Sequence, residues 1–393
     1  MVFVLGTKNL HYRLDYRKYI LLVLPIFLLA SCHPLKEVEK LIEYNFLDKQ
    51  LIIVPNVIVN DSIKGDFIFD SGSNHTIINL KKVKNNVSKS KTITDFYGNT
   101  DKISILKKNS IRIANFNLVN LKLRAYDLSI LSKKYNIIGI LGTDIISKFS
   151  WKFDYNNKKL LISNKPFKND TLSFINVDFN NKSLIKDKIK INGIYKNDFI
   201  LDSGSLSEIN TNDSLLALKD STNFIEQNLI RSLASKNYKN YKIYLSYNSK
   251  IDIGIHKFND CKLQAESNSH NLIGLDFFSR TIFVFDGIAS KFYFHSQAKI
   301  DKLIKNRRGL RFGLDENDNI FVEAITEKGE SYLKGIKIGD IIVGIDKLNI
   351  FTYKKRIEEL NQLRNSINEL SIERNNTILH FKFDDPNFSK IKE

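Results

Sequence analysis

The chain of 393 residues contains only two cysteines, and this scarcity sets the first limits on its architecture. One is Cys32, at the end of an N-terminal segment, and the other is Cys261. We expect the thiol of Cys32 to be modified, for the reason given below, so Cys261 would have no partner for an intramolecular disulfide in the mature chain. Cys261 lacks the flanking residues of a thiol-enzyme motif, and we expect a buried or idle thiol there.

Motifs for several function classes are missing as well. The excess of 60 Lys and Arg over 43 Asp and Glu gives a formal net charge of +17, which admits nucleic acid or an anionic membrane surface as a partner. No zinc-ligand spacing, basic helix or aromatic–basic alternation supports the first of these, so we expect no nucleic-acid binding. No Ser–His or Cys–His motif indicates a nucleophilic enzyme, and no residue pattern indicates a metal or a cofactor.

The N-terminal apolar run is short. Tyr19–Ala30 follows a basic segment, and about a dozen residues are too few to span a bilayer comfortably, so residues 1–31 are predicted to be a signal peptide. Leu29-Ala30-Ser31-Cys32 resembles the lipobox of bacterial lipoproteins. The resemblance implies lipidation of Cys32, a tether over residues 32–47, and an exported, membrane-anchored protein that faces the periplasm or the cell surface. A cleaved signal peptide or a short anchor helix that happens to contain a cysteine is the alternative.

A duplicated motif is the most informative feature that is present. Phe67–Gly72 reads Phe-Ile-Phe-Asp-Ser-Gly, and Phe199–Gly204 reads Phe-Ile-Leu-Asp-Ser-Gly. An apolar-apolar-Gly-x-Asp segment follows each copy, at Ile140–Asp144 and at Leu272–Asp276. Both pairs of motifs are 132 residues apart. A shared offset indicates a duplicated lobe, in which each copy contributes one carboxylate.

A single Asp-Ser-Gly after a strand is most often a turn. In duplicate, and with the second motif in register, the pattern resembles the lobe signature of pepsin- and retropepsin-like aspartic peptidases over roughly residues 48–296. The resemblance implies a mainly β chain with a bilobal double-β-barrel (acid protease) fold. Its N-terminal lobe would cover residues 48–165 and its C-terminal lobe residues 166–300.

The same resemblance implies catalytic roles for Asp70 and Asp202. Two neighbouring carboxylates share one proton, since both cannot ionise cheaply. The ionised one takes a proton from a water molecule, and the protonated one polarises the scissile carbonyl. Six residues would support the pair: hydroxyls that link the two loops, glycines that admit backbone amides, and hydroxyls that lower the pKa values and favour an acidic pH profile. They are, in that order, Ser71 and Ser203, Gly72 and Gly204, and Ser73 and Ser205.

The family resemblance also implies a flap hairpin over the cleft. Tyr97, in Asp95–Thr100, is the candidate flap residue, although an ordinary surface hairpin is equally compatible with this segment. His75 lies close to the first motif, and we expect a surface or core imidazole there.

Residues 301–393 differ in character from the duplicated part. Ser331–Asp346 resembles a bacterial PDZ domain, but Leu333 stands where that family favours Ala, and Asp346-Lys347-Leu348 stands where Asn-Gly is usual. The resemblance implies a separate domain for a peptide ligand, with the next strand pairing with that ligand. Its carboxylate-binding residues would be Arg311, Phe312, Gly313 and Leu314.

The motifs predict a membrane-anchored aspartic endopeptidase for peptide or protein substrates, with a PDZ domain for recruitment or regulation. Two other classes stay open. An inactive lipoprotein scaffold or peptide-binding protein would need no paired carboxylates. A sugar-cleaving enzyme would hold two carboxyl groups about 5 Å or more apart, and it would not explain the duplicated lobe.

Overall fold

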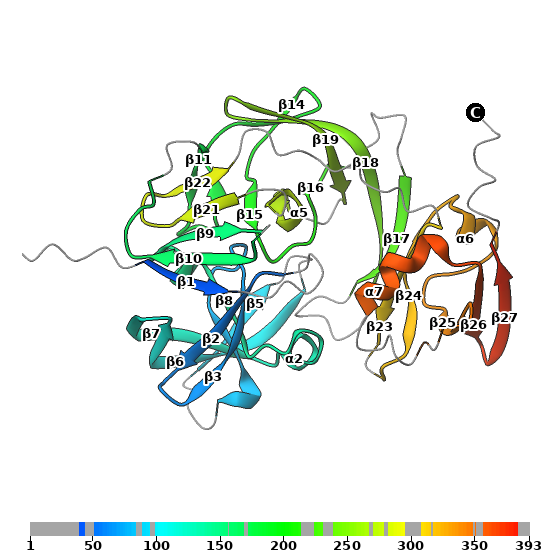
Figure 1. The fold of residues 1–393 in the computed structure, drawn as a ribbon, viewed down its shortest axis with the longest axis horizontal. Helices are drawn as coiled ribbons and strands as arrows, with labels where there is room; N and C mark the ends of the chain where they lie inside the picture. The colour runs from blue at the N-terminus through cyan, green and yellow to red at the C-terminus, as the bar shows by residue number, and fades with distance from the viewer. Residues whose placement is uncertain are drawn as a thin grey trace, which may run out of the picture. The chain divides into compact units, whose positions relative to one another are not determined.

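The computed structural model describes residues 39–43, 51–83, 89–94, 99–155, 157–168, 172–213, 224–230, 239–266, 270–278, 282–294, 308–315, 317–348, 350 and 357–383. Strands dominate these ranges, and the prediction of a mainly β chain is confirmed (Figure 1). No helix within them is long and apolar enough to cross a membrane. The predicted signal peptide and Cys32 lie outside the described residues.

Six strands in the first part of the chain close into a barrel. They pair in the order β2-β3-β8-β4-β7-β6, and β6 pairs again with β2. Successive side chains of a strand point to opposite faces, so alternating residues such as Ile111 and Ile113 are buried inside the barrel. The strands are β2 (Ile53–Val59), β3 (Ile63–Phe69), β4 (Ile77–Asn79), β6 (Thr100–Ile113), β7 (Phe116–Tyr126) and β8 (Gly139–Leu141).

A second set of strands repeats the pairing of this barrel. β16 is parallel to β19 and antiparallel to β20, and β15 is parallel to β20. The same relations join β4 to β7, β4 to β8, and β3 to β8. The duplicated motifs therefore occupy equivalent places in two equivalent sheets. The strands are β12 (Leu184–Ile185), β13 (Ile189–Ile191), β14 (Ile194–Lys196), β15 (Ile200–Asp202), β16 (Ile209–Thr211), β18 (Lys239–Ile253), β19 (His256–Ala265) and β20 (Leu272–Gly274).

A shared antiparallel sheet takes three strands from each copy, in the order β1-β10-β9-β21-β22-β11. We call residues 39–163 the first repeat and residues 173–294 the second repeat. Lys152 pairs with Val284, and these residues are themselves 132 positions apart, so a local two-fold axis passes between them. The strands are β1 (Glu39–Glu43), β9 (Ser150–Asp154), β10 (Lys159–Ser163), β11 (Ser173–Asp178), β21 (Ile282–Asp286) and β22 (Lys291–Phe294).

Strand β1 differs from the sequence-based expectation, which places residues 39–43 in a tether. These residues pair with β10 at the edge of the shared sheet, and Ile42 packs against the main apolar core. The charged residues of Glu-Lys-Leu-Ile-Glu resemble solvated chain, but charges are common on edge strands, where they discourage pairing with other molecules.

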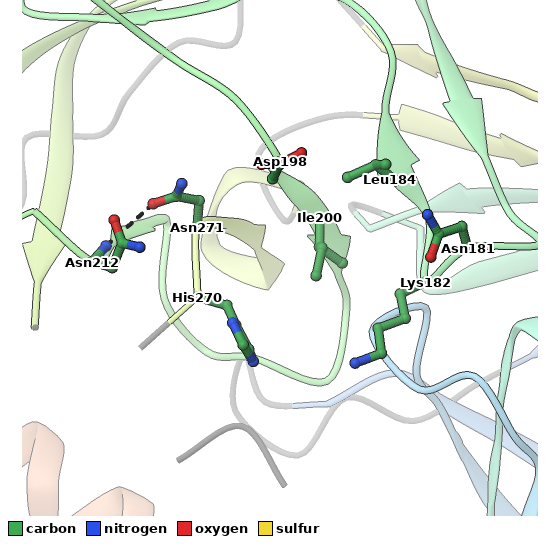
Figure 2. A pocket seen from close by; sticks show the side chains of 8 residues that line it. All are labelled: Asn181, Lys182, Leu184, Asp198, Ile200, Asn212, His270 and Asn271. Carbon is green, nitrogen blue, oxygen red and sulfur yellow. Dashed lines mark hydrogen bonds between the residues drawn. The ribbon is translucent and has the colours of Figure 1, made fainter. Parts of the chain in front are cut away.

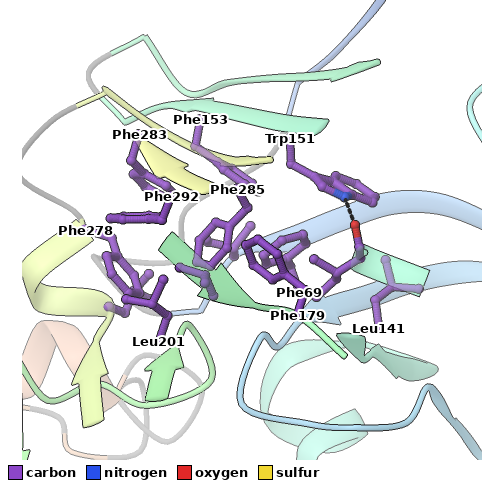
Figure 3. Close-up of a cluster of buried hydrophobic side chains, with 14 of the residues drawn as sticks. Phe69, Leu141, Trp151, Phe153, Phe179, Leu201, Phe278, Phe283, Phe285 and Phe292 are labelled. Atoms are coloured by element: carbon purple, nitrogen blue, oxygen red, sulfur yellow. Dashed lines mark hydrogen bonds between the residues drawn. The ribbon is translucent and has the colours of Figure 1, made fainter. Parts of the chain in front are cut away.

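Aromatic side chains from both repeats pack together beside the shared sheet (Figure 3). Phe69, the last residue of β3, lies against Trp151, Phe153 and Phe285, with ring centroids 5.1, 4.9 and 5.4 Å away. Edge-to-face contacts of this kind add about 0.5–1.5 kcal/mol each to the burial of the rings. The residue immediately before Asp70 is thus held by side chains of both repeats.

Each repeat also carries a long hairpin. β5 (Lys89–Thr94) pairs with the start of β6, and β17 (Phe224–Ile230) pairs with the start of β18. The helices of the repeats are short, as the few helical signals in the sequence indicate. They are η1 (Leu80–Lys82), α2 (Ser129–Tyr135), α3 (Thr143–Ile146) and α5 (Leu275–Phe278).

Residues 308–383, which we call the C-terminal module, have an apolar core of their own. Ile357 and Leu360 share one face of the helix α7 and belong to this core, and the module ends in the hairpin β26–β27. Strand β24 pairs with β17, so the sheet of the module continues into the second-repeat hairpin (Figure 1). The elements are β23 (Leu310–Leu314), β24 (Ile320–Thr326), α6 (Glu330–Leu333), β25 (Ile341–Ile345), α7 (Ile357–Leu363), η3 (Arg364–Ser366), β26 (Glu369–Arg374) and β27 (Thr377–Lys382).

Candidate active site

Each Asp-Ser-Gly motif begins where a buried strand ends. Asp70 follows β3, which is parallel to β8, and Asp202 is the last residue of β15, which is parallel to β20. The backbone N–H of Asp70 donates to the carbonyl oxygen of Leu141 (3.0 Å). The apolar strands thus bring both aspartates to the carboxyl ends of parallel strand pairs, where polar side chains can face an opening.

The serines of the two motifs join the loops by four reciprocal hydrogen bonds. The Ser71 hydroxyl donates to the Leu201 carbonyl oxygen (2.7 Å), and the Ser203 hydroxyl donates to that of Phe69 (2.9 Å). Each hydroxyl also accepts from the backbone N–H of the other serine, at 3.0 Å in both directions. Both side chains are fully buried. Since every donor and acceptor is paired across the local two-fold axis, the two loops form one rigid unit, as predicted for Ser71 and Ser203.

The glycines are required by space. A Cβ atom on Gly72 would lie 2.4 Å from the Asp202 Cγ, and one on Gly204 would lie 2.7 Å from the Asp70 Cγ. Each glycine amide also donates to the aspartate of its own motif, at 2.9 Å to Oδ1. Each carboxyl group therefore accepts a hydrogen bond from one repeat and packs on the glycine of the other.

The two carboxyl groups are close enough for each to change the pKa of the other. Burial, followed by the negative charge of Asp202, raises the pKa of Asp70 well above its usual range. Burial also raises the pKa of Asp202, although hydrogen bonds from the Gly204 amide and from Asp70 act in the opposite direction. Such a pair takes up and releases protons as a unit. It keeps one proton at pH values at which an isolated carboxyl group is already ionised.

Ser73 and Ser205 act differently from the prediction. Their backbone amides, and not their hydroxyls, lower the pKa values of the aspartates. The Ser73 hydroxyl donates to the His75 carbonyl oxygen (3.0 Å), and the Ser205 hydroxyl bonds to that of Ser207 (2.9 Å). A hydroxyl has one proton to donate. The expected hydroxyl contribution to an acidic pH profile is therefore replaced by a backbone contribution.

The second motif of the first repeat braces the loop that follows Asp70. Asp144 Oδ1 accepts from both the backbone N–H and the hydroxyl of Thr76, at 2.9 and 2.7 Å. That hydroxyl in turn accepts from the Gly142 amide (3.1 Å). The sequence analysis gave Thr76 no role, because no local signal joins it to a carboxylate 68 residues later.

A hydrogen bond joins the two long hairpins. Lys239, at the start of β18, donates through Nζ to Asn99 Oδ1 (2.5 Å), and Asn99 directly precedes β6. The flap candidate Tyr97 itself lies outside the described residues. The second hairpin has no counterpart in the sequence-based expectation, which includes a single flap.

Other candidate residues lie away from the carboxyl pair. His75 Nδ1 is 4.0 Å from Asp144 Oδ2, its side chain is 49% exposed, and burial followed by the charge of Arg124 lowers its pKa. Cys261 is buried, and its Sγ donates to the Asn259 carbonyl oxygen (3.8 Å). Within the ranges that the structure describes, no cluster of three or more His, Cys, Asp or Glu side chains has the arrangement of a metal site.

The four residues predicted to hold a ligand carboxylate lie in β23, and each of them already has partners within the protein. The Phe312 backbone N–H donates to Asn361 Oδ1 (2.8 Å), and Asn361 Nδ2 donates to the Phe312 carbonyl oxygen (2.9 Å). Asn361 thus makes the hydrogen bonds of a pairing strand. Arg311 instead contacts Glu323 and Asn228 (2.9 and 2.5 Å). Gly313 and Leu314 pair with the next strand, β24, which is itself paired on its other edge.

In comparisons with known proteins, no protein-family model matches the chain, and no curated protein is similar to it.

Proposed function

We propose that the protein is an aspartic endopeptidase that hydrolyses peptide bonds with a water molecule activated between Asp70 and Asp202. The observation that carries the proposal is the pairing of the two aspartates, each packed on the glycine of the other repeat and held in place by reciprocal serine bonds between the repeats. In the same proposal, the two repeats form a bilobal pepsin/retropepsin-like double-β-barrel. The hairpins that meet at Asn99 and Lys239 cover its cleft.

The chemistry needs one proton on the pair. The ionised carboxyl group accepts a proton from the water as the water attacks the scissile carbonyl, and the protonated one donates toward the developing oxyanion. That proton later passes to the departing amine. Gly72 and Gly204 keep the carboxyl oxygens within reach of each other, because neither presents a side chain to the aspartate of the other repeat.

The sugar-cleaving class is disfavoured by the close packing around Gly72. Its amide donates to Asp70 Oδ1 at 2.9 Å, and a Cβ atom on the same residue would lie 2.4 Å from the Asp202 Cγ, so both carboxyl groups lie against one glycine. Glycoside hydrolases hold their two carboxyl groups about 5 Å or more apart, so that a sugar or a water molecule fits between them. An inactive scaffold stays the second candidate, and the next experiment separates it from an enzyme.

Inhibitor classes and the pH profile test the reaction. We expect a peptide mimic with a hydroxyl at the scissile position to inhibit hydrolysis, and a chelator, a serine-reactive reagent and a thiol reagent to leave it unchanged. A plot of kcat/KM against pH should be bell-shaped. Because burial raises the pKa of Asp70, its alkaline limb should lie above 3.8, the value of an ordinary aspartate. Abolition by the chelator would contradict the proposal, and a purified protein that cleaves no peptide would favour the scaffold.

The proposal includes an N-terminal lipid anchor at Cys32 and a PDZ-like C-terminal module. Asn361 occupies the strand edge at Phe312, and β24 pairs with the hairpin β17–β18. These contacts favour regulation over recruitment, since the module is joined to a hairpin whose far end reaches the first repeat at Asn99. Binding events at the module would then reach the cleft through β17.

Arg311 offers a test of this connection. Its guanidinium bonds to Asn228 and lies 3.7 Å from Glu226, both in β17. We expect Arg311→Ala to accelerate amide hydrogen exchange over residues 224–230 and to lower kcat/KM by about 3-fold or more, because it removes a charge-assisted contact worth roughly 1 kcal/mol or more. The exposed Lys347 gives the control variant Lys347→Ala. Unchanged exchange and activity in Arg311→Ala would contradict the connection.

A further inference from the structure

A polar pocket of about 400 Å³ lies in the second repeat, next to the strand that carries Asp202 (Figure 2). Lys182, Leu184, Ile200 and His270 contribute to its wall, together with Asn212 and Asn271. The volume falls in the range of pockets that bind small ligands or side chains.

The pocket opens on the same side of β15 as the catalytic carboxylate. Ile200 and Asp202 are two residues apart on this strand, so their side chains share one face, while the buried Leu201 faces the other. Two residues of a strand span roughly 6.6 Å. A substrate side chain within two residues of a peptide bond held at Asp202 can therefore reach the pocket. The charge of Lys182 also acts on Asp202, where it lowers the pKa.

The first repeat has no equivalent opening at the same positions. Residues 132 positions before Leu184, Ile200 and His270 are Ile52, Ile68 and Ile138. All three isoleucines are buried within apolar clusters. Their counterparts in the second repeat are only partly buried or exposed. The duplication therefore has a filled apolar version of this site beside Asp70 and an open polar version beside Asp202.

The charge in the pocket comes from Lys182. Its ammonium group forms no ion pair with any described residue, and Figure 2 shows the side chain directed toward His270. Burial, followed by the charge of Lys182, lowers the pKa of His270, so the ring is neutral at pH 7 and retains one N–H donor. Asp198 is the opposing charge, but it is exposed to solvent and lies at another edge of the pocket (Figure 2).

We propose that this pocket binds the carboxylate side chain of a substrate residue beside the scissile bond, with Lys182 as the residue that selects glutamate or aspartate. The inference rests on the proposed peptidase function and adds its substrate class. The Lys182 ammonium group gains a charge-assisted hydrogen bond from such a side chain, whereas a lysine or arginine there would place two like charges together. The strongly basic chain would also attract acidic peptides.

A degenerate peptide library tests the selection. Mass spectrometry of the products from the parent protein should show Asp or Glu enriched about 10-fold over Asn or Gln beside the cleaved bonds. Lys182→Gln should bring this ratio close to one, and Lys182→Glu should favour Lys or Arg. Lys188→Gln removes the same charge from an exposed site outside the pocket wall and should keep the parental ratio. The ratio is internal to each protein, so a general change in rate does not affect it.

A binding measurement separates this proposal from the proposed reaction. Fluorescence anisotropy with Asp70→Asn protein should show about 10-fold tighter binding of a glutamate peptide than of its glutamine analogue, and the added Lys182→Gln change should abolish the difference. Cleavage by the parent with no acidic preference would overturn the pocket assignment and leave the peptidase standing. Tighter binding of the glutamate peptide without any cleavage would support the pocket assignment and overturn the proposed peptidase function. Equal binding of both peptides together with no cleavage would overturn both.

Discussion

Replacing either Asp70 or Asp202 by Asn should lower kcat/KM for peptide hydrolysis by at least about 100-fold. An amide cannot hold the shared proton, and the remaining carboxylate ionises alone, without an acid partner. Folding should persist, because Asn has the size of Asp and retains an oxygen that can accept from the Gly72 or Gly204 amide. Steady-state kinetics together with thermal unfolding of each variant measures the two effects separately.

The double variant distinguishes a coupled pair from two independent carboxylates. Groups that act as a unit are non-additive, so Asp70→Asn combined with Asp202→Asn should be scarcely worse than either change alone. Asp61→Asn is a suitable control, since this side chain is 79% exposed and lies outside the site. Full activity in either single variant would overturn the assignment of the pair, whatever the effect of the other.

Gly72→Ala should cause a loss comparable to that of the aspartate variants, at least about 100-fold, with no chemical group removed. The new Cβ atom would lie 2.4 Å from the Asp202 Cγ, and real Cβ atoms essentially never approach a neighbour so closely. The Asp202 carboxyl group must move away, which changes its position relative to Asp70. Overpacking of this kind should also lower the free energy of unfolding by about 1–3 kcal/mol.

Gly193→Ala provides a matched control for the effect on stability. Gly193 has a φ of +86°, but a Cβ atom there would meet nothing within 4 Å. We expect it to cost about 1 kcal/mol of stability through backbone strain and to leave kcat/KM unchanged. Activity in Gly72→Ala equal to that of Gly193→Ala would show that the carboxyl groups tolerate displacement, and the close-approach argument would fail.

Much of the candidate site is predictable because its chemistry repeats in the chain. The offset of 132 between the motifs pairs Asp70 with Asp202, and the same offset separates the serines that link the loops. The roles of Gly72 and Gly204 also follow from the motif, and their positions against the opposite aspartates are consistent with it. In each case the signal is a few adjacent residues at the end of a buried strand.

Other features were missed because their partners are distant and differ in type. Thr76 braces the site through Asp144, and Asn361 closes the strand edge at Phe312. A hydroxyl or an amide side chain has many possible partners, and its position in the sequence does not select one. The hydroxyls of Ser73 and Ser205 illustrate the same limit, since their hydrogen bonds join them to His75 and Ser207 and not to the carboxylates.

The sequence by itself determined the mainly β character, the duplication and the two aspartates, because strand periodicity and motif spacing are local properties of a chain. Tertiary structure alone decided that each carboxyl group packs on the glycine of the other repeat, that β17 joins the C-terminal module, and that a pocket opens beside Asp202. The physical reason is packing. Ile68 and Ile200 are the same residue type at equivalent positions of two equivalent strands, and only their neighbours make one place a filled core and the other an open, charged pocket.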